Sequence, residues 1–234
     1  MRPVLILQHE DECPPALVGE YLAGTPFPTV VRRLHAGDES PSEPDGYAAV
    51  IVLGGDMNVG DEDDFPFLRH ERATIAAALE LGVPLLGICL GAQQLAMVAG
   101  GSVYRRTAVE IGWYPIDIDE YDPLIVGYHP RMHVFQWHHC ACVLPDGALL
   151  IASRAGEPQI FRVGERAWGL QFHPEVDRAV LDGWFASDPE AIDDAWPGGL
   201  KKLRKASRRE LLRSSMLCGQ LVGNFLSASG ARDR

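Results

Sequence analysis

The chain has 234 residues, of which 47% are hydrophobic, and its formal net charge is −11. A chain of this length can bury one sizeable core, so we expect one domain over residues 1–234. The acidic balance argues against a nucleic-acid-binding surface. No apolar run approaches the ~20 residues that a membrane span requires, and the five cysteines favour a reducing compartment over a disulfide framework. We therefore expect a cytoplasmic protein without a membrane segment.

The first half of the chain alternates short apolar runs with segments of helix formers. The apolar runs predict buried strands of a parallel sheet, at 4–7, 29–34, 47–53 and 84–88. The segments between and after them predict helices, at 16–22, 67–81 and 92–99. This alternation indicates an α/β fold with a mostly parallel central sheet and helices on both faces.

The second half of the chain is denser in β pattern. Strands are predicted at 102–104, 111–118, 133–138, 149–153, 160–163 and 167–172. Apolar and polar residues alternate over 116–119, which is typical of an exposed antiparallel strand, so we expect an antiparallel extension of the sheet. A break at 188–199 precedes a terminal helix at 200–226, whose first half is basic. That basic half is either a solvated helix face or a docking site for a partner or an acidic substrate.

Gly54 and Gly55 directly follow the predicted strand at 47–53. A glycine pair at the carboxyl end of a strand in an α/β sheet can present backbone N–H groups to a ligand. An ordinary tight turn has the same composition. We favour the ligand-binding interpretation because a second unusual turn follows the next strand.

That turn contains Cys89, with Gly87 two residues before it and Gly91 two residues after. Glycine at both positions allows a sharp strand-to-helix turn and leaves room beside the sulfur, as in the Gly-x-Ser-x-Gly nucleophile elbow. The position at a helix N-terminus favours the thiolate. A buried structural cysteine is the alternative.

A third motif, His173-Pro174-Glu175, ends a predicted strand. Proline keeps His173 extended, and residues i and i+2 of an extended chain point to the same side. Glu175 can then bind one imidazole nitrogen while the other faces the sulfur of Cys89. This is the nucleophile, base and orienter arrangement of a catalytic triad.

With these motifs in this order, the chain resembles the class I glutamine amidotransferases, which use such a triad. The resemblance covers residues 4–185. Smaller signals at 110–113 and 159–164 resemble the stand-alone, GMP-synthase-like members. The resemblance implies a flavodoxin-like sheet and an oxyanion hole formed by the amides of Gly55 and Leu90. It also implies substrate contacts from Gly54 and Gln93.

The family's stretch for the amino-acid end of glutamine corresponds to Trp137-His138-His139-Cys140. It usually reads His-Gly-Asp. The histidine is kept as His138, whereas His139 and Cys140 occupy the glycine and aspartate positions. We therefore expect free glutamine to be a weak substrate of the isolated chain.

The resemblance implies hydrolysis of the γ-carboxamide of glutamine through a thioester on Cys89, giving glutamate and ammonia without a cofactor. The sequence has no glycine-rich phosphate loop of a synthase, so we expect a separate synthase subunit to use the ammonia. Two alternatives stay open. The chain could be a stand-alone γ-glutamyl hydrolase or peptidase, or a non-catalytic protein that binds or regulates a partner.

One cluster of histidines and cysteines raises the possibility of a zinc site. Its members are His129, His133, His138, His139, Cys140 and Cys142. In a strand His138 would face away from His133 and His139, and no further element completes four ligands. We predict no metal.

Overall fold

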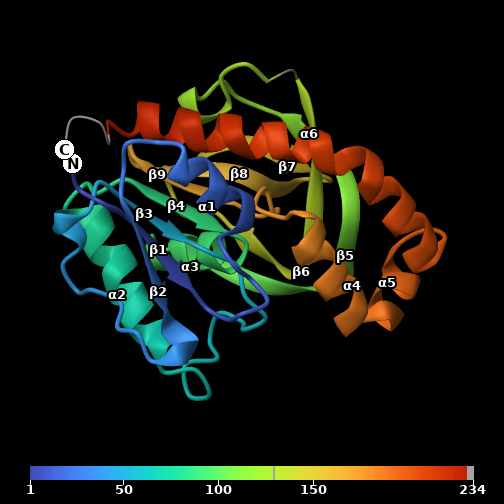
Figure 1. Cartoon of the computed structure of the whole chain (residues 1–234). Coiled ribbons are helices and arrows are strands. Elements are labelled where there is room, and N and C mark those ends of the chain that lie inside the picture. Colours follow the sequence, from blue (N-terminus) through green and yellow to red (C-terminus); the bar gives the residue numbers. More distant parts are fainter. Residues whose placement is uncertain (129, 231–234) are drawn as a thin grey trace.

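The computed structural model describes residues 1–128 and 130–230, and its centre is one nine-stranded sheet (Figure 1). The strand order is β2-β1-β3-β4-β9-β8-β7-β5-β6. The first five of these strands are parallel and the remaining pairings are antiparallel. The strands are β1 Val4–Gln8, β2 Thr29–Arg33, β3 Ala49–Val52, β4 Leu85–Ile88, β5 Ser102–Ile118, β6 Arg131–Val143, β7 Leu149–Arg154, β8 Glu157–Val163 and β9 Ala167–Leu170.

Six α-helices accompany the sheet in the described part of the chain. They are α1 Ala16–Ala23, α2 Phe67–Glu80, α3 Leu90–Val98, α4 Arg178–Ser187, α5 Pro189–Ala195 and α6 Gly199–Ala228. Three short 3-10 helices lie at Leu34–Ala36, Pro44–Gly46 and Pro123–Ile125. None of the helices in these described ranges is both long and apolar enough to cross a membrane.

Four of the five parallel strands are buried on both faces because helices cover each side of the sheet, whereas the edge strand β2 is partly exposed. Every residue of β1, β3, β4 and β9 is buried, which explains their continuous apolar sequences. One core packs α1 and α6 against one face, and a second core packs α2 and α3 against the other. The predicted α/β fold, with its mostly parallel sheet, helices on both faces and antiparallel extension, is confirmed.

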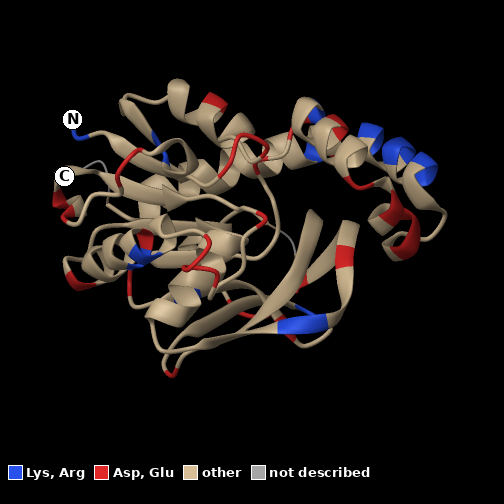
Figure 2. Cartoon of the chain, turned by 90° about the horizontal axis from the view of Figure 1, so that it is seen from below, with Lys and Arg blue, Asp and Glu red and all other residues tan. Residues whose placement is uncertain are grey.

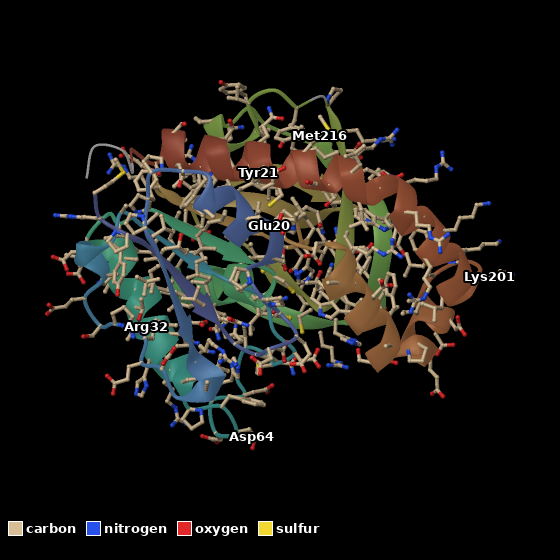
Figure 3. All side chains as sticks on the ribbon, in the orientation of Figure 1. Glu20, Tyr21, Arg32, Asp64, Lys201 and Met216 are labelled. Carbon is tan, nitrogen blue, oxygen red and sulfur yellow. The ribbon has the colours of Figure 1, made fainter. Side chains whose placement is uncertain are left out.

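The long helix α6 lies across the α1 face of the sheet (Figure 1). Tyr21 of α1 packs under it, and the hydroxyl of Tyr21 donates to the carbonyl of Ser215 at 2.7 Å (Figure 3). Gly219 allows this approach, since a Cβ there would lie 2.5 Å from Cζ of the Tyr21 ring. The predicted terminal helix is therefore present, with its second half packed on the core.

The first half of α6 packs against β5, where Nε1 of Trp113 donates to Oγ of Ser207 at 2.9 Å. It also carries a cluster of Lys and Arg residues, with the acidic helix α5 beside it (Figure 2). Some of its cations are paired, as in the ion pair between Arg204 and Asp182 at 2.6 Å. The remaining cations of α6 are compatible with both interpretations of the basic half, a solvated helix face and a docking site.

Two of the differences from the expected secondary structure have clear local causes. Residues 102–118 form one long strand, because the irregular stretch is absorbed as a shift in register between Arg105 and Glu110 rather than as a loop. The expected break at 188–199 contains the short helix α5. Asp188 caps it by accepting from the amide of Ala191 at 3.0 Å, and Pro189 occupies its first turn, so Asp-Pro marks a helix start here.

Candidate active site

Cys89 lies in the sharp turn between β4 and α3, and its backbone is strained. Its φ and ψ are 49° and −105°, a region that non-glycine residues rarely adopt. Both neighbouring glycines are needed for the turn. A Cβ on Gly87 would lie 2.5 Å from the carbonyl carbon of Gly91, and a Cβ on Gly91 would collide with the carbonyl of Val52. The predicted elbow is thus fixed by close backbone packing.

The surroundings of Cys89 are polar on one side and nearly closed to solvent. The residue is 6% exposed at the N-terminus of α3. Its sulfur lies 3.9 Å from the carbonyl oxygen of Trp137 and 3.7 Å from Nε2 of Gln171. Strand β6 and the segment after β9 therefore meet at this sulfur.

His173 and Glu175 follow β9, and both are buried. Nδ1 of His173 lies 2.6 Å from Oε1 of Glu175. Burial by itself lowers the pKa of His173, but the Glu175 carboxylate and Cys89 outweigh it and raise this pKa well above its ordinary value. Trp184 packs edge-on against the imidazole, with ring centroids 4.9 Å apart. The structure therefore brings the predicted base and the predicted orienter together.

The loop after β3 lies against both groups. A Cβ on Gly54 would lie 2.9 Å from Cε1 of His173 and 3.4 Å from Cβ of Cys89, so only glycine fits between them. The amides of Gly55 and Leu90 have no hydrogen-bond partner among the described residues. Both N–H groups are thus available to a ligand, as an oxyanion hole requires.

Gln93 is buried on the first turns of α3 and connects to the sulfur indirectly. Its Nε2 lies 3.3 Å from Oε1 of Gln171, whose own amide contacts Cys89. Sequence reasoning missed Gln171. The signal was present, since Gln171 lies two residues before His173 in an extended segment and so projects to the same side.

The predicted substrate-binding stretch lies on β6, where its side chains diverge. The ring of Trp137 stacks on Phe185 at 6.3 Å and packs against Trp184. Nδ1 of His138 lies 2.7 Å from the carbonyl of Cys140, and its Nε2 lies 3.3 Å from Oε2 of Glu110. The side chain of His138 is therefore engaged within the antiparallel extension, whereas the backbone of Trp137 reaches the sulfur.

His139 is exposed and Cys140 is buried. Burial and the nearby charge of Arg105 lower the pKa of His139. The thiol of Cys140 lies 3.7 Å from Oδ1 of Asn58, in the loop that contains Gly54 and Gly55. Position 140 thus faces the predicted oxyanion loop.

Glu110 anchors β5 to its neighbours, and sequence reasoning gave it no role beyond the resemblance. It accepts from Arg106 at 2.7 Å and from Arg154 at 2.6 Å, in addition to its contact with His138. Burial alone raises its pKa, but these three partners outweigh it and lower the pKa to about 2. An ionised carboxylate therefore fixes the strand pair that carries Trp137.

The histidine and cysteine cluster does not converge. His133 lies 3.5 Å from Glu210, His138 contacts Glu110, and His139 is exposed. Within residues 1–128 and 130–230, no group of three or more His, Cys, Asp or Glu side chains could hold a metal ion. His129 lies outside the described residues.

Known proteins place the chain in one family. The family model described as glutamine amidotransferase class-I matches residues 18–183. The chain is 37% identical over 134 residues to a subunit of the glutamine-hydrolyzing GMP synthase of Methanoculleus marisnigri, covering 56% of this chain and 67% of that protein. It is 29% identical over 170 residues to a putative glutamine amidotransferase-like protein, YfeJ, of Salmonella typhimurium, covering 70% and 71%. It matches only 27% of the length of an Aeropyrum pernix GMP synthase, at 36% identity over 59% of this chain.

Solved structures agree with this placement. A glutamine amidotransferase from Thermotoga maritima superposes with a TM-score of 0.87 at 28% identity, covering 97% of this chain and 99% of that one. A glutamine amido transferase from Methylobacillus flagellatus shares the fold, with a TM-score of 0.89 at 23% identity and coverage of 97% and 95%. The resemblance read from the motifs is confirmed. The chain belongs to the class-I glutamine amidotransferase family.

Proposed function

We propose that this chain hydrolyses the side-chain carboxamide of glutamine and supplies the ammonia to a separate synthase subunit. One observation carries the proposal. A cysteine on a strained elbow shares a buried site with a histidine that is hydrogen-bonded to a glutamate. Membership of the amidotransferase family supports the substrate, and the likeness to one subunit of a glutamine-hydrolyzing GMP synthase supports the partner.

In the proposed reaction, His173 takes the thiol proton of Cys89, and the thiolate attacks the amide carbon of the substrate. The raised pKa of His173 supports this transfer, because the imidazolium is favoured beside Glu175. The amides of Gly55 and Leu90 bind the oxyanion, each contributing roughly 3 kcal/mol as in comparable sites.

The intermediate then collapses as His173 returns its proton to the departing nitrogen. The C–N bond breaks, ammonia leaves, and a γ-glutamyl thioester remains on Cys89. A water molecule, deprotonated by His173, attacks the thioester, and the thiol is released with glutamate. Glu175 keeps the imidazole oriented and stabilises its charged form throughout.

A second candidate function rests on β6. The position where the family has an aspartate carries Cys140, which contacts Asn58. A site without that carboxylate holds the α-ammonium of free glutamine less well, so hydrolysis of another γ-glutamyl compound, with the same triad, is the alternative.

The deciding experiment measures ammonia from glutamine, and amine release from a panel of γ-glutamyl amides and peptides. The control is Cys89→Ala, which removes only the sulfur. We expect release from glutamine that is lost in the variant. Release only from the other compounds would favour the alternative, and no release from any of them would favour a non-catalytic role.

A further inference from the structure

A second histidine–glutamate pair lies beneath the candidate active site. His9 directly follows β1 and Glu71 belongs to α2, and both side chains are fully buried. Nε2 of His9 is hydrogen-bonded to Oε2 of Glu71, and Nδ1 lies 2.9 Å from the carbonyl oxygen of Gly54. The proposed reaction uses neither side chain, although the pair holds the glycine that separates Cys89 from His173.

The contact with Gly54 fixes the direction of the following amide. The described residues contain no cis peptide bond, so the carbonyl of Gly54 and the N–H of Gly55 belong to one planar trans unit and point in opposite directions. With the carbonyl held toward His9, the N–H of Gly55 points away from it. That N–H has no partner within the described ranges.

The protonation of His9 follows from its partners. A carbonyl oxygen accepts a hydrogen bond, so Nδ1 of His9 donates to Gly54, and Nε2 shares a proton with Oε2 of Glu71. Burial lowers the pKa of His9, but Glu71, the Gly54 carbonyl and Glu10 together outweigh it and raise the pKa. The hydrogen bond from His9 also polarises the Gly54–Gly55 peptide, which strengthens its N–H as a donor.

A contribution to folding stability does not explain why His9 and Glu71 are buried together. Burying two charges costs about as much as their attraction returns, and an apolar replacement is often no worse. The second carboxylate oxygen of Glu71 is buried without a hydrogen-bond partner among the described residues, which adds to the cost. What the arrangement does provide is a fixed orientation for one peptide at the site.

We propose that His9 and Glu71 are positioning residues that hold the Gly54–Gly55 peptide so that the Gly55 amide stays directed at the oxyanion. The identity of the oxyanion in this proposal depends on the proposed function. The hold on the loop itself rests only on the contacts of His9.

The kinetic test uses His9→Leu, which removes both hydrogen bonds, and His9→Asn, which keeps a donor for the Gly54 carbonyl. We expect His9→Leu to lower kcat for glutamine about 100-fold, the loss typical of one oxyanion donor. KM should stay within about threefold, since the contact forms only in the transition state. His9→Asn should recover most of the rate, and Glu71→Gln should lower kcat about fivefold because the charge alone is lost.

Two controls separate positioning from general damage. Iodoacetamide alkylates Cys89 without forming an oxyanion, so its rate should match wild type in His9→Leu. The matched variant is Asp122→Asn, which perturbs another fully buried carboxylate, bonded to Arg162 and Trp168. It should lower the melting temperature with unchanged kcat. Equal losses of alkylation and turnover in His9→Leu would overturn the proposal.

A readout that needs no turnover keeps the inference apart from the proposed function. Hydrogen–deuterium exchange of residues 53–58 should accelerate at least tenfold in His9→Leu, and not in Asp122→Asn, if the hydrogen bond holds the loop. Unchanged exchange in His9→Leu would refute the proposal even if the wild type releases ammonia. Faster exchange in a chain that hydrolyses no γ-glutamyl compound would support the hold on the loop and refute the proposed function.

Discussion

Two regions of the sheet meet at Cys89, and they contribute to the site in different ways. The parallel region supplies Cys89, the Gly54–Gly55 loop and the His173–Glu175 pair, each shortly after a buried strand. The antiparallel region supplies one strand, β6, whose backbone reaches the sulfur at Trp137. The carboxyl ends of parallel strands meet at one edge of a sheet, so the fold itself places the residues of the parallel region. The position of β6 depends instead on the contacts of this particular chain.

Loss of the proposed base, His173 in the parallel region, should have the largest effect on activity. We expect His173→Ala to lower kcat for ammonia release by about 10³-fold or more, because the general base and acid are the same side chain. Alkylation of Cys89 by iodoacetamide at neutral pH should slow as well, since His173 is no longer present to take the thiol proton. A loss below about tenfold would remove His173 from the proposed mechanism.

Glu175→Gln should cost less, about 10- to 100-fold in kcat, because the orienter acts through the histidine. It should also move the pH profile in a definite direction. The Glu175 carboxylate raises the pKa of His173, so its removal lowers that pKa. The alkaline limb of kcat/KM, which reports the free enzyme, should shift to lower pH. A limb that stays in place would mean that another group holds the imidazolium.

The sequence was sufficient to predict the parallel region and to single out the residues that the structure brings together beside Cys89. The elbow, the glycine pair and His-x-Glu are local patterns whose geometry follows from backbone rules over a few residues. The pair of His9 and Glu71, 62 residues apart, could not be predicted, because only the packing of α2 against the end of β1 brings the two together. Trp184 escaped notice for the same reason, since α4 places it against His173.

The antiparallel region was less predictable in its details. The stretch 105–110 has no clear strand pattern, yet β5 continues through it because Glu110 is tied to Arg106, Arg154 and His138. Tertiary ion pairs thus decide the course of the strand where the hydrophobic pattern is weak. The engagement of His138 with Glu110 depends on this same cross-strand pairing.

Glu110→Gln is therefore a specific way to disturb β6 and leave Cys89, His173 and Glu175 in place. Breaking a buried charge cluster by removing one partner costs about 3 kcal/mol. The folded pKa of Glu110 is lowered to about 2, so its contribution is present above about pH 4.5 and is lost as the pH falls toward 2. We expect a lower melting temperature at pH 7 and a KM for glutamine raised about tenfold with kcat nearly unchanged.

The matched control lies on the same strand pair. Asp117 and Arg131 form an ion pair at 2.7 Å with both side chains more than half exposed, so Asp117→Asn should change neither the melting temperature nor KM measurably. Equal effects of Glu110→Gln and Asp117→Asn would show that β6 responds to any change in its hairpin and that Glu110 has no special role.

The smallest expected effect concerns the residues by which β6 departs from the family. Cys140 faces Asn58 of the glycine loop and pairs across the strands with Arg105. A carboxylate there would lie near the predicted position of a substrate ammonium. We expect His139→Gly combined with Cys140→Asp to raise kcat/KM for glutamine about three- to fivefold, since a remote contact can act on the transition state as well as on binding.

Cys140→Ser is the matched control for this pair of substitutions, because it keeps the size of the side chain and adds no charge. It should leave kcat/KM within about twofold. The informative contrary result is an isolated wild-type chain that already hydrolyses glutamine efficiently and loses activity when both residues are changed. The stretch from Trp137 to Cys140 would then be a working clamp as it stands, with backbone groups and His139 in place of the carboxylate. The parallel region would then supply the reacting groups for glutamine, and the antiparallel region would supply the clamp for the same substrate.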